Sequence, residues 1–98
     1  MRLPQELCAE ELWLRNYYGG YISAKEIGEI LRKNNLKLKK GKTLDDVWLA
    51  FGRGLKNIYG NAIKAREQIA EEIDKVCIIA RWDFAVEKYS RANSQLQS

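Results

Sequence analysis

The side chains best suited to specific chemistry are the Lys and Arg residues in the middle third of the chain. Between positions 32 and 66 there are ten of them and only two acids, so this segment carries a charge of +8. Both flanking segments are acidic: residues 1–31 carry three bases and five acids, and residues 67–98 carry four bases and six acids. Because segregated charge of one sign builds a local field, we expect a polyanion as the partner of this segment.

The other reactive side chains form no pattern that indicates catalysis. The chain has no histidine, and its two cysteines, Cys8 and Cys77, lie far apart in the sequence, which disfavours the usual zinc sets and Ser–His or Cys–His pairs. The acids form local clusters with no sign of the convergence that a two-metal site needs. Gly41-Lys42-Thr43 resembles only the end of a phosphate-binding loop, because Leu36 occupies the position of its first glycine. We expect no enzyme activity, metal or cofactor, and we expect both cysteines to be reduced core residues.

Helix signals are clear in the first third of the chain. Residues 4–18 begin with a proline, which suits the first position of a helix, and are followed by two glycines. Residues 23–34 begin with Ser23, and Glu26 stands three positions later, which is the pattern of a capping box. The sequence therefore predicts two helices here.

The middle of the chain predicts a short extended segment and a third helix. Residues 36–42 alternate leucine and lysine at their start, which indicates a short strand or extended loop, a small β-wing with its lysines pointing outward. Residues 44–58 follow a second capping-box pattern and carry apolar residues three or four positions apart. Gly52 and Gly54 interrupt this segment, and they either allow close backbone approach or break the helix.

Residues 22–58 together resemble a helix-turn-helix module. The resemblance rests on a capped first helix with a small residue, Gly28, in its second turn, where it would let the second helix cross closely. The connection of about eight residues is longer than the usual three or four, which favours a winged or looser variant. Such a module implies contact with duplex DNA, with lysines on phosphates and one helix in the major groove. The expected nucleic-acid-binding residues are Arg32, Lys33, Lys37, Lys39, Lys40 and Lys42 for phosphates and Arg53, Lys56 and Asn57 near base edges.

The last third predicts a long helix. Residues 61–92 contain neither glycine nor proline and carry two apolar stripes with helical spacing. A helix of that length would extend beyond a compact domain of this size, so we expect it to pair with a second copy. The residues expected at that dimer interface are Ile78, Trp82, Ala85 and Tyr89. A strand is the alternative for residues 76–86, whose C-terminal part also alternates between apolar and other residues.

These observations predict one all-α domain over residues 1–98, with three or four helices, acting as a small cytoplasmic DNA-binding regulator or accessory factor. No signal peptide or transmembrane segment is expected. The alternative is a helical adaptor or inhibitor whose basic face docks on an acidic protein. RNA binding through Tyr17, Tyr18 and Tyr21 remains a third hypothesis, against the alternative that these tyrosines close the core.

Overall fold

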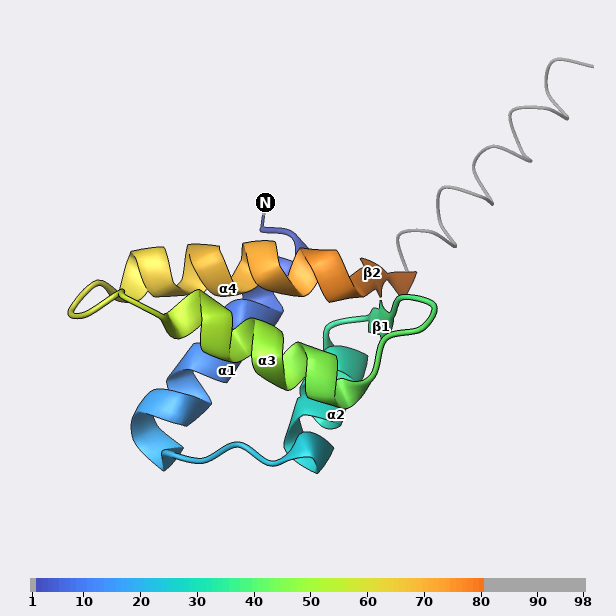
Figure 1. The fold of residues 1–98 in the computed structure, drawn as a ribbon, viewed down its shortest axis with the longest axis horizontal. Helices are drawn as coiled ribbons and strands as arrows, with labels where there is room; N and C mark the ends of the chain where they lie inside the picture. Colours follow the sequence, from blue (N-terminus) through green and yellow to red (C-terminus); the bar gives the residue numbers. More distant parts are fainter. Residues whose placement is uncertain (1, 81–98) are drawn as a thin grey trace, which may run out of the picture.

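The computed structural model describes residues 2–80, which form four helices and a small sheet (Figure 1). The predicted all-α architecture with a small β element is confirmed for this part of the chain. In chain order the elements are α1 (Pro4–Gly19), α2 (Ala24–Lys33), β1 (Leu36–Leu38), α3 (Leu44–Leu55), α4 (Ala62–Val76) and β2 (Cys77–Ile79).

Short-range hydrogen bonds explain where the helices begin. The Ser23 side chain accepts a hydrogen bond from the backbone N–H of Glu26 at 3.2 Å, as the sequence predicts for the start of α2. Before α3, the backbone N–H of Thr43 donates to Asp46 Oδ2 at 2.8 Å. The side chain of Asn61 caps α4 in the same manner as Ser23 caps α2. Each contact satisfies a backbone or side-chain group that the helix itself leaves without a partner.

The helices enclose one apolar core. Figure 1 shows α3 and α4 side by side, with α1 behind them and α2 next to β1. The largest fully buried side chains come from α1, α2, α3, α4 and the segment before α2, and they are Cys8, Leu12, Ile22, Ile27, Ile30, Val47, Ile69 and Ile73. Because no buried polar or charged residue interrupts this cluster within residues 2–80, apolar burial holds the elements together.

A tight backbone crossing lies between α3 and α4 rather than between α2 and α3. A Cβ atom added to Gly54 would lie 2.6 Å from the Cα of Ile69 on α4, so this position requires glycine. A Cβ added to Gly28 would meet only the Leu44 side chain, at an ordinary 3.7 Å. The expectation that Gly28 is what permits a close crossing is therefore wrong, because the tight backbone contact is made at Gly54.

Helix α3 ends three residues before the predicted limit of 58. Its C-cap, Lys56, has an extended backbone with ψ 130°, and Asn57 adopts a left-handed conformation with φ 63°. Neither residue can continue the helix in these conformations. The two glycines, by contrast, do not break the helix, and the alternative of close approach applies at Gly54.

The predicted helix over 61–92 is wrong at residues 77–79. Helix α4 ends at Val76, and β2 follows at once, antiparallel to β1 with Leu36 opposite Ile79 and Leu38 opposite Cys77. The strand alternative applies here because an isolated β1 would leave its backbone groups without partners, and β2 supplies them. The predicted β-wing is thus half of a sheet whose second strand comes from far along the chain. The rest of the predicted helix, 81–92, lies outside the described residues.

Candidate nucleic-acid interface

Four lysines are presented together by β1 and the turn that follows it. We call Lys37, Lys39, Lys40 and Lys42 the lysine cluster. Leu36 is buried and Leu38 packs against the core, so the alternation of the strand directs Lys37 to the other side. The turn is closed by a hydrogen bond from the Lys42 N–H to the Lys39 carbonyl at 3.0 Å, and Gly41 between them has φ 82°.

No carboxylate within residues 2–80 neutralises the charges of the lysine cluster. None of its four ammonium groups makes an ion pair there, although six such contacts join other side chains. Three of the four side chains are exposed, and Lys39 is half-buried. The strand pairing and the turn hold the backbone beneath these lysines, so their charges remain close together and available to an anion.

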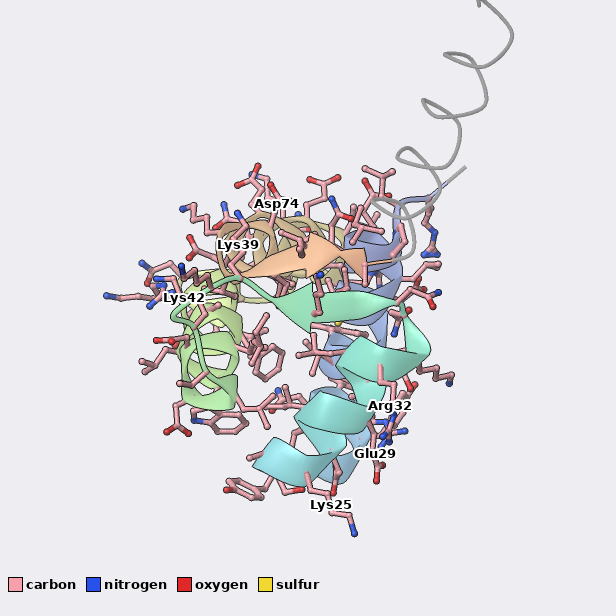
Figure 2. The ribbon with its side chains drawn as sticks, turned by 90° about the vertical axis from the view of Figure 1, so that its right-hand side faces the viewer. Lys25, Glu29, Arg32, Lys39, Lys42 and Asp74 are labelled. Atoms are coloured by element: carbon pink, nitrogen blue, oxygen red, sulfur yellow. The ribbon has the colours of Figure 1, made fainter. Side chains whose placement is uncertain are left out.

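Of the two basic residues at the end of α2, Lys33 has an ionic partner and Arg32 has none within residues 2–80. Lys33 Nζ lies 3.3 Å from Glu11 Oε1 on α1. Arg32 is exposed and has no ion pair within the described part of the chain. Figure 2 shows Lys39 and Lys42 on one side of this end of the molecule, with Asp74 beside Lys39, and Arg32 and Lys25 on the other side, with Glu29 between them. Arg32 is therefore available to an anion at a place apart from Lys39 and Lys42, whereas Lys33 is engaged with Glu11, which Arg15 also contacts at 3.3 Å.

The residues predicted to approach base edges lie at the other end of α3. That helix has twelve residues, which correspond to about 18 Å, and Lys56 and Asn57 follow its C-terminus. Arg53 Nε donates to Glu72 Oε2 at 2.9 Å, and Lys75 binds the other oxygen of Glu72 at 3.0 Å. The structure thus gathers the lysine cluster but separates it from Arg53, Lys56 and Asn57.

The N-terminus of α3 is itself acidic. Asp45 is exposed in the first turn, and Asp46 is engaged with the backbone N–H of Thr43. These carboxylates already complement the positive end of the helix dipole and would repel a phosphate placed there. An approaching anion is therefore expected on the lysines that precede α3 rather than on the helix terminus.

Several aromatic side chains are exposed on the surface, which the sequence alone could not establish. Tyr17, Tyr18 and Tyr21 all belong to this set, which contradicts the alternative that they close the core. The Tyr21 ring lies 5.5 Å from that of Trp48 on α3. Half-buried Trp13, by contrast, stacks on Tyr17 and lies beneath Arg66 of α4 at 5.2 Å. The surface therefore offers aromatic as well as cationic groups.

Sequence reasoning also missed a groove beside α3. It has a volume of about 430 Å³ and is lined by Asn16, Trp48, Leu49, Phe51, Gly52, Arg53, Leu55 and Lys56. Its apolar wall includes Leu49, which, like its neighbour Trp48, is exposed on the surface of α3. The available signal was that Leu49 lies off the stripe spaced by three and four residues, so that α3 carries more apolar residues than one buried face needs.

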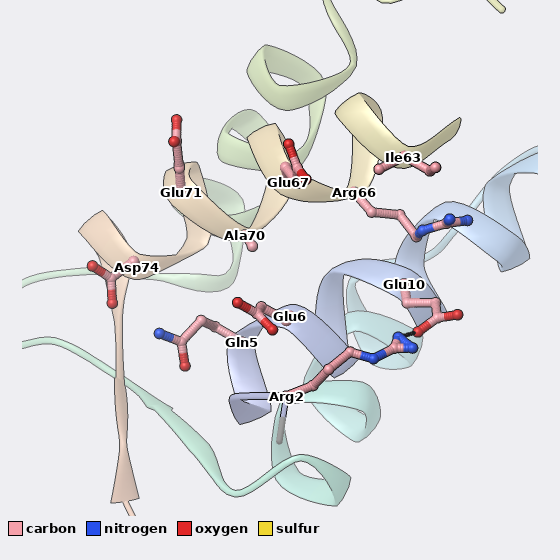
Figure 3. Close-up of a pocket in the computed structure, with 10 residues that line it drawn as sticks. All are labelled: Arg2, Gln5, Glu6, Glu10, Ile63, Arg66, Glu67, Ala70, Glu71 and Asp74. Carbon is pink, nitrogen blue, oxygen red and sulfur yellow. Dashed lines mark hydrogen bonds and ion pairs between the residues drawn. The ribbon is translucent and has the colours of Figure 1, made fainter. Parts of the chain in front are cut away.

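A second cleft, between α1 and α4, has the opposite charge. Figure 3 shows the ten residues that line it, and carboxylates predominate among them. Arg2 pairs with Glu10 across one side, whereas Glu6, Glu67, Glu71 and Asp74 make no ion pair within residues 2–80. This cleft would repel a polyanion, and it reaches the end of the molecule that carries Lys39, where Figure 2 shows Asp74.

The two cysteines are buried free thiols, as predicted. Burial raises the pKa of Cys8 to about 12 and that of Cys77 to about 11. A thiol with so high a pKa is a poor nucleophile at neutral pH. Within residues 2–80 there is also no group of three His, Cys, Asp or Glu side chains arranged to hold a metal.

Of the four residues predicted at a dimer interface, the structure describes one. Ile78 is half-buried in β2, where it pairs with Lys37 of β1. Trp82, Ala85 and Tyr89 lie outside the described residues. No helix between residues 2 and 80 combines the length and apolar character needed to span a membrane.

No family model, curated protein or solved structure matches this chain. The geometry and charge of its own surface are therefore the basis for a functional proposal.

Proposed function

We propose that the protein is a small non-catalytic nucleic-acid-binding protein, a regulator or accessory factor that engages duplex DNA. The observation that carries this proposal is the lysine cluster, in which four cations without ionic partners in residues 2–80 are held together by β1 and its turn. Lysines bind phosphates and release condensed counterions, a source of affinity that needs no particular base sequence.

The contact has two parts in this proposal. The lysine cluster and Arg32 engage phosphates at one end of α3. Lys56 and Asn57 form a second group about 18 Å away along the helix, roughly half of the 34 Å repeat of duplex DNA. Arg53 joins this second group by exchanging Glu72 for a phosphate or base edge. Positions 37–42 supply affinity, and the second group supplies whatever preference for sequence the protein has.

The test is fluorescence anisotropy with a mixed-sequence duplex at several salt concentrations. If the lysine cluster and Arg32 engage about five phosphates, the logarithm of affinity falls with the logarithm of salt with a slope of about −4.5. Replacing all four lysines of the cluster with alanine should flatten that slope to about −0.9, and Lys42→Ala alone should flatten it by about 0.9.

Lys33→Ala is the matched control, because it removes the same charge from an exposed side chain that already has an ionic partner, Glu11 Oε1 at 3.3 Å. It should leave affinity and slope nearly unchanged. Equal effects of Lys42→Ala and Lys33→Ala would show that only net charge matters. Unchanged binding by the fourfold variant would refute the proposed interface.

The groove beside α3 favours a second candidate function, that of a helical protein-interaction module whose basic face docks on an acidic protein. Exposed Trp48 and Leu49 provide apolar contact, and Arg53 and Lys56 stand at the same groove. Tryptophan and arginine are prominent among residues that dominate protein interfaces. Absence of duplex binding at low salt, together with an oligomer that Leu49→Arg converts to a monomer in light scattering, would favour this function.

A further inference from the structure

Tyr21 and Trp48 form an aromatic pair on the surface, contributed by separate segments. Tyr21 belongs to the connection between α1 and α2 and is 75% exposed, whereas Trp48 belongs to α3 and is 37% exposed. Their ring centroids are 5.5 Å apart and the ring planes are inclined at 57°. The rings therefore touch each other while leaving much of their surface to the solvent.

The backbone around this pair is anchored, so the rings have a defined position. Ile22, the neighbour of Tyr21, is 1% exposed and holds the connection against the core. Trp48 leans on buried Phe51, with the two centroids 6.1 Å apart. Neither the core nor a neighbouring helix covers the outward surface of Tyr21. An aromatic surface held in this way has the properties of a stacking platform, because little freedom is lost when a flat ligand settles on it.

Cations flank the pair in the chain. Lys25 lies in the first turn of α2, four positions after Tyr21, and Lys42 lies two positions before α3 begins. Both are exposed and make no ion pair within residues 2–80. Exposed Asp45 stands one turn before Trp48, so phosphates are expected on the two lysine sides and not along the helix. A ligand suited to this surface combines flat apolar groups with separate negative charges.

We propose that Tyr21 and Trp48 stack on unpaired bases of a single nucleic-acid strand whose phosphates run toward the lysine cluster. This inference rests on the proposed function, since it assumes that the lysines hold the backbone. Every base offers a π-face, so such contacts tolerate any sequence, and they add to the phosphate contacts. The bound substrate is then a strand with unpaired bases, such as a frayed end, gap or loop next to a duplex.

The test compares two single strands that carry equal numbers of phosphates. One is an oligothymidine of about 12 nucleotides, within the range that small single-strand binding domains cover. The other has the same backbone with abasic sites throughout. At fixed salt, the protein should bind oligothymidine at least about fivefold more tightly, because each stacked base contributes that much or more. Its tryptophan fluorescence should be quenched by oligothymidine and not by the abasic strand.

Substitutions test whether the aromatic pair causes the difference in affinity between oligothymidine and the abasic strand. Tyr21→Ala should weaken oligothymidine binding by about fivefold or more, leave the abasic strand unaffected, and keep the salt slope unchanged. Tyr21→Phe retains the ring and should restore the affinity. Trp48→Leu should behave as Tyr21→Ala does, while its apolar side chain maintains the contact with Phe51. Tyr59→Ala is the matched control, because Tyr59 is 97% exposed in the connection between α3 and α4.

The outcomes separate this inference from the proposed function. Equal affinity for both strands, with a steep salt slope and no effect of Tyr21→Ala, would overturn the stacking site and leave the phosphate contact standing. Loss of oligothymidine binding in Tyr21→Ala with no effect of the fourfold lysine variant would support stacking and refute the lysine interface. If Tyr21→Ala changes no oligonucleotide affinity but dissociates an oligomer, the surface belongs to a protein contact and the inference is wrong.

Discussion

Replacing Gly54 with alanine tests the tightest contact in the fold. Gly54 on α3 is buried against α4, and an added Cβ would lie 2.6 Å from Ile69 Cα and 2.8 Å from both Ile69 N and Ile69 Cγ1. Two of these three atoms belong to the backbone, so a side-chain rotation cannot relieve the clash. The helices α3 and α4 have to move apart, and the apolar contacts between them loosen.

The expected change in the free energy of unfolding of Gly54→Ala combines two opposing contributions. Overpacking a well-filled core costs about 1–3 kcal/mol and more where backbone must move, whereas Gly→Ala in a helix interior gains about 1 kcal/mol. Because the obstacle is backbone, we expect the upper part of the range to apply and the free energy of unfolding to fall by about 2 kcal/mol. For a domain of this size that change lowers Tm by about 8–16 °C.

Gly52→Ala provides the matched control two residues earlier in the same helix. Nothing lies within 4 Å of a Cβ added there, and Gly52 is exposed. This variant should gain up to about 1 kcal/mol from helix propensity alone. Urea and thermal unfolding of both variants, followed by circular dichroism, measure the difference. A Gly54→Ala protein as stable as wild type, or as stable as Gly52→Ala, would refute the close crossing of α3 and α4.

Two further predictions concern the titratable groups. Hydrogen bonds from Arg53 and then Lys75 lower the pKa of the Glu72 carboxyl, so its contribution to stability is present above the pKa of the unfolded state, about 4.3, and is lost as pH falls through the lower folded value. Glu72→Gln should therefore destabilise the protein at pH 7 more than Glu71→Gln does, and urea unfolding in strong acid should show no such difference. Burial raises the pKa of Cys8 to about 12 and of Cys77 to about 11, so a thiol reagent at pH 8 should label neither cysteine until urea unfolds the protein. The same shifts stabilise the fold below the unfolded thiol pKa, and this contribution should decline as pH rises from there through the folded values. Rapid labelling of the native protein would contradict the burial of both thiols.

Helix starts were predictable because their causes are local. The capping residues Ser23 and Thr43 each interact with a residue three positions later, so the relevant partners are visible in the sequence. The end of α4 was not predictable in this way. The segment after Val76 has helical spacing by its pattern, yet its conformation depends on β1, which lies some forty residues earlier. A short apolar run is compatible with helix or strand, and only the available partner decides.

The candidate interface was also only partly predictable from the sequence. That the middle third is strongly basic follows from the sequence, but which cations are free does not. Lys33 pairs with Glu11 and Arg53 with Glu72, contacts that span 22 and 19 positions, whereas the lysine cluster has no such partner within residues 2–80. Periodicity likewise could not reveal that Tyr21 meets Trp48 at the surface, because the two residues belong to separate elements.

The amino-acid sequence by itself therefore determined the segregation of charge, which is a matter of composition along the chain, and the helical class and helix starts, which depend on neighbours within about one helical turn. Tertiary structure decided the β1–β2 pairing, the crossing at Gly54, the ion pairs that balance some cations, and the exposure of the tyrosines. These features depend on which distant segments meet in the folded chain, and that depends on how all the apolar faces are buried together.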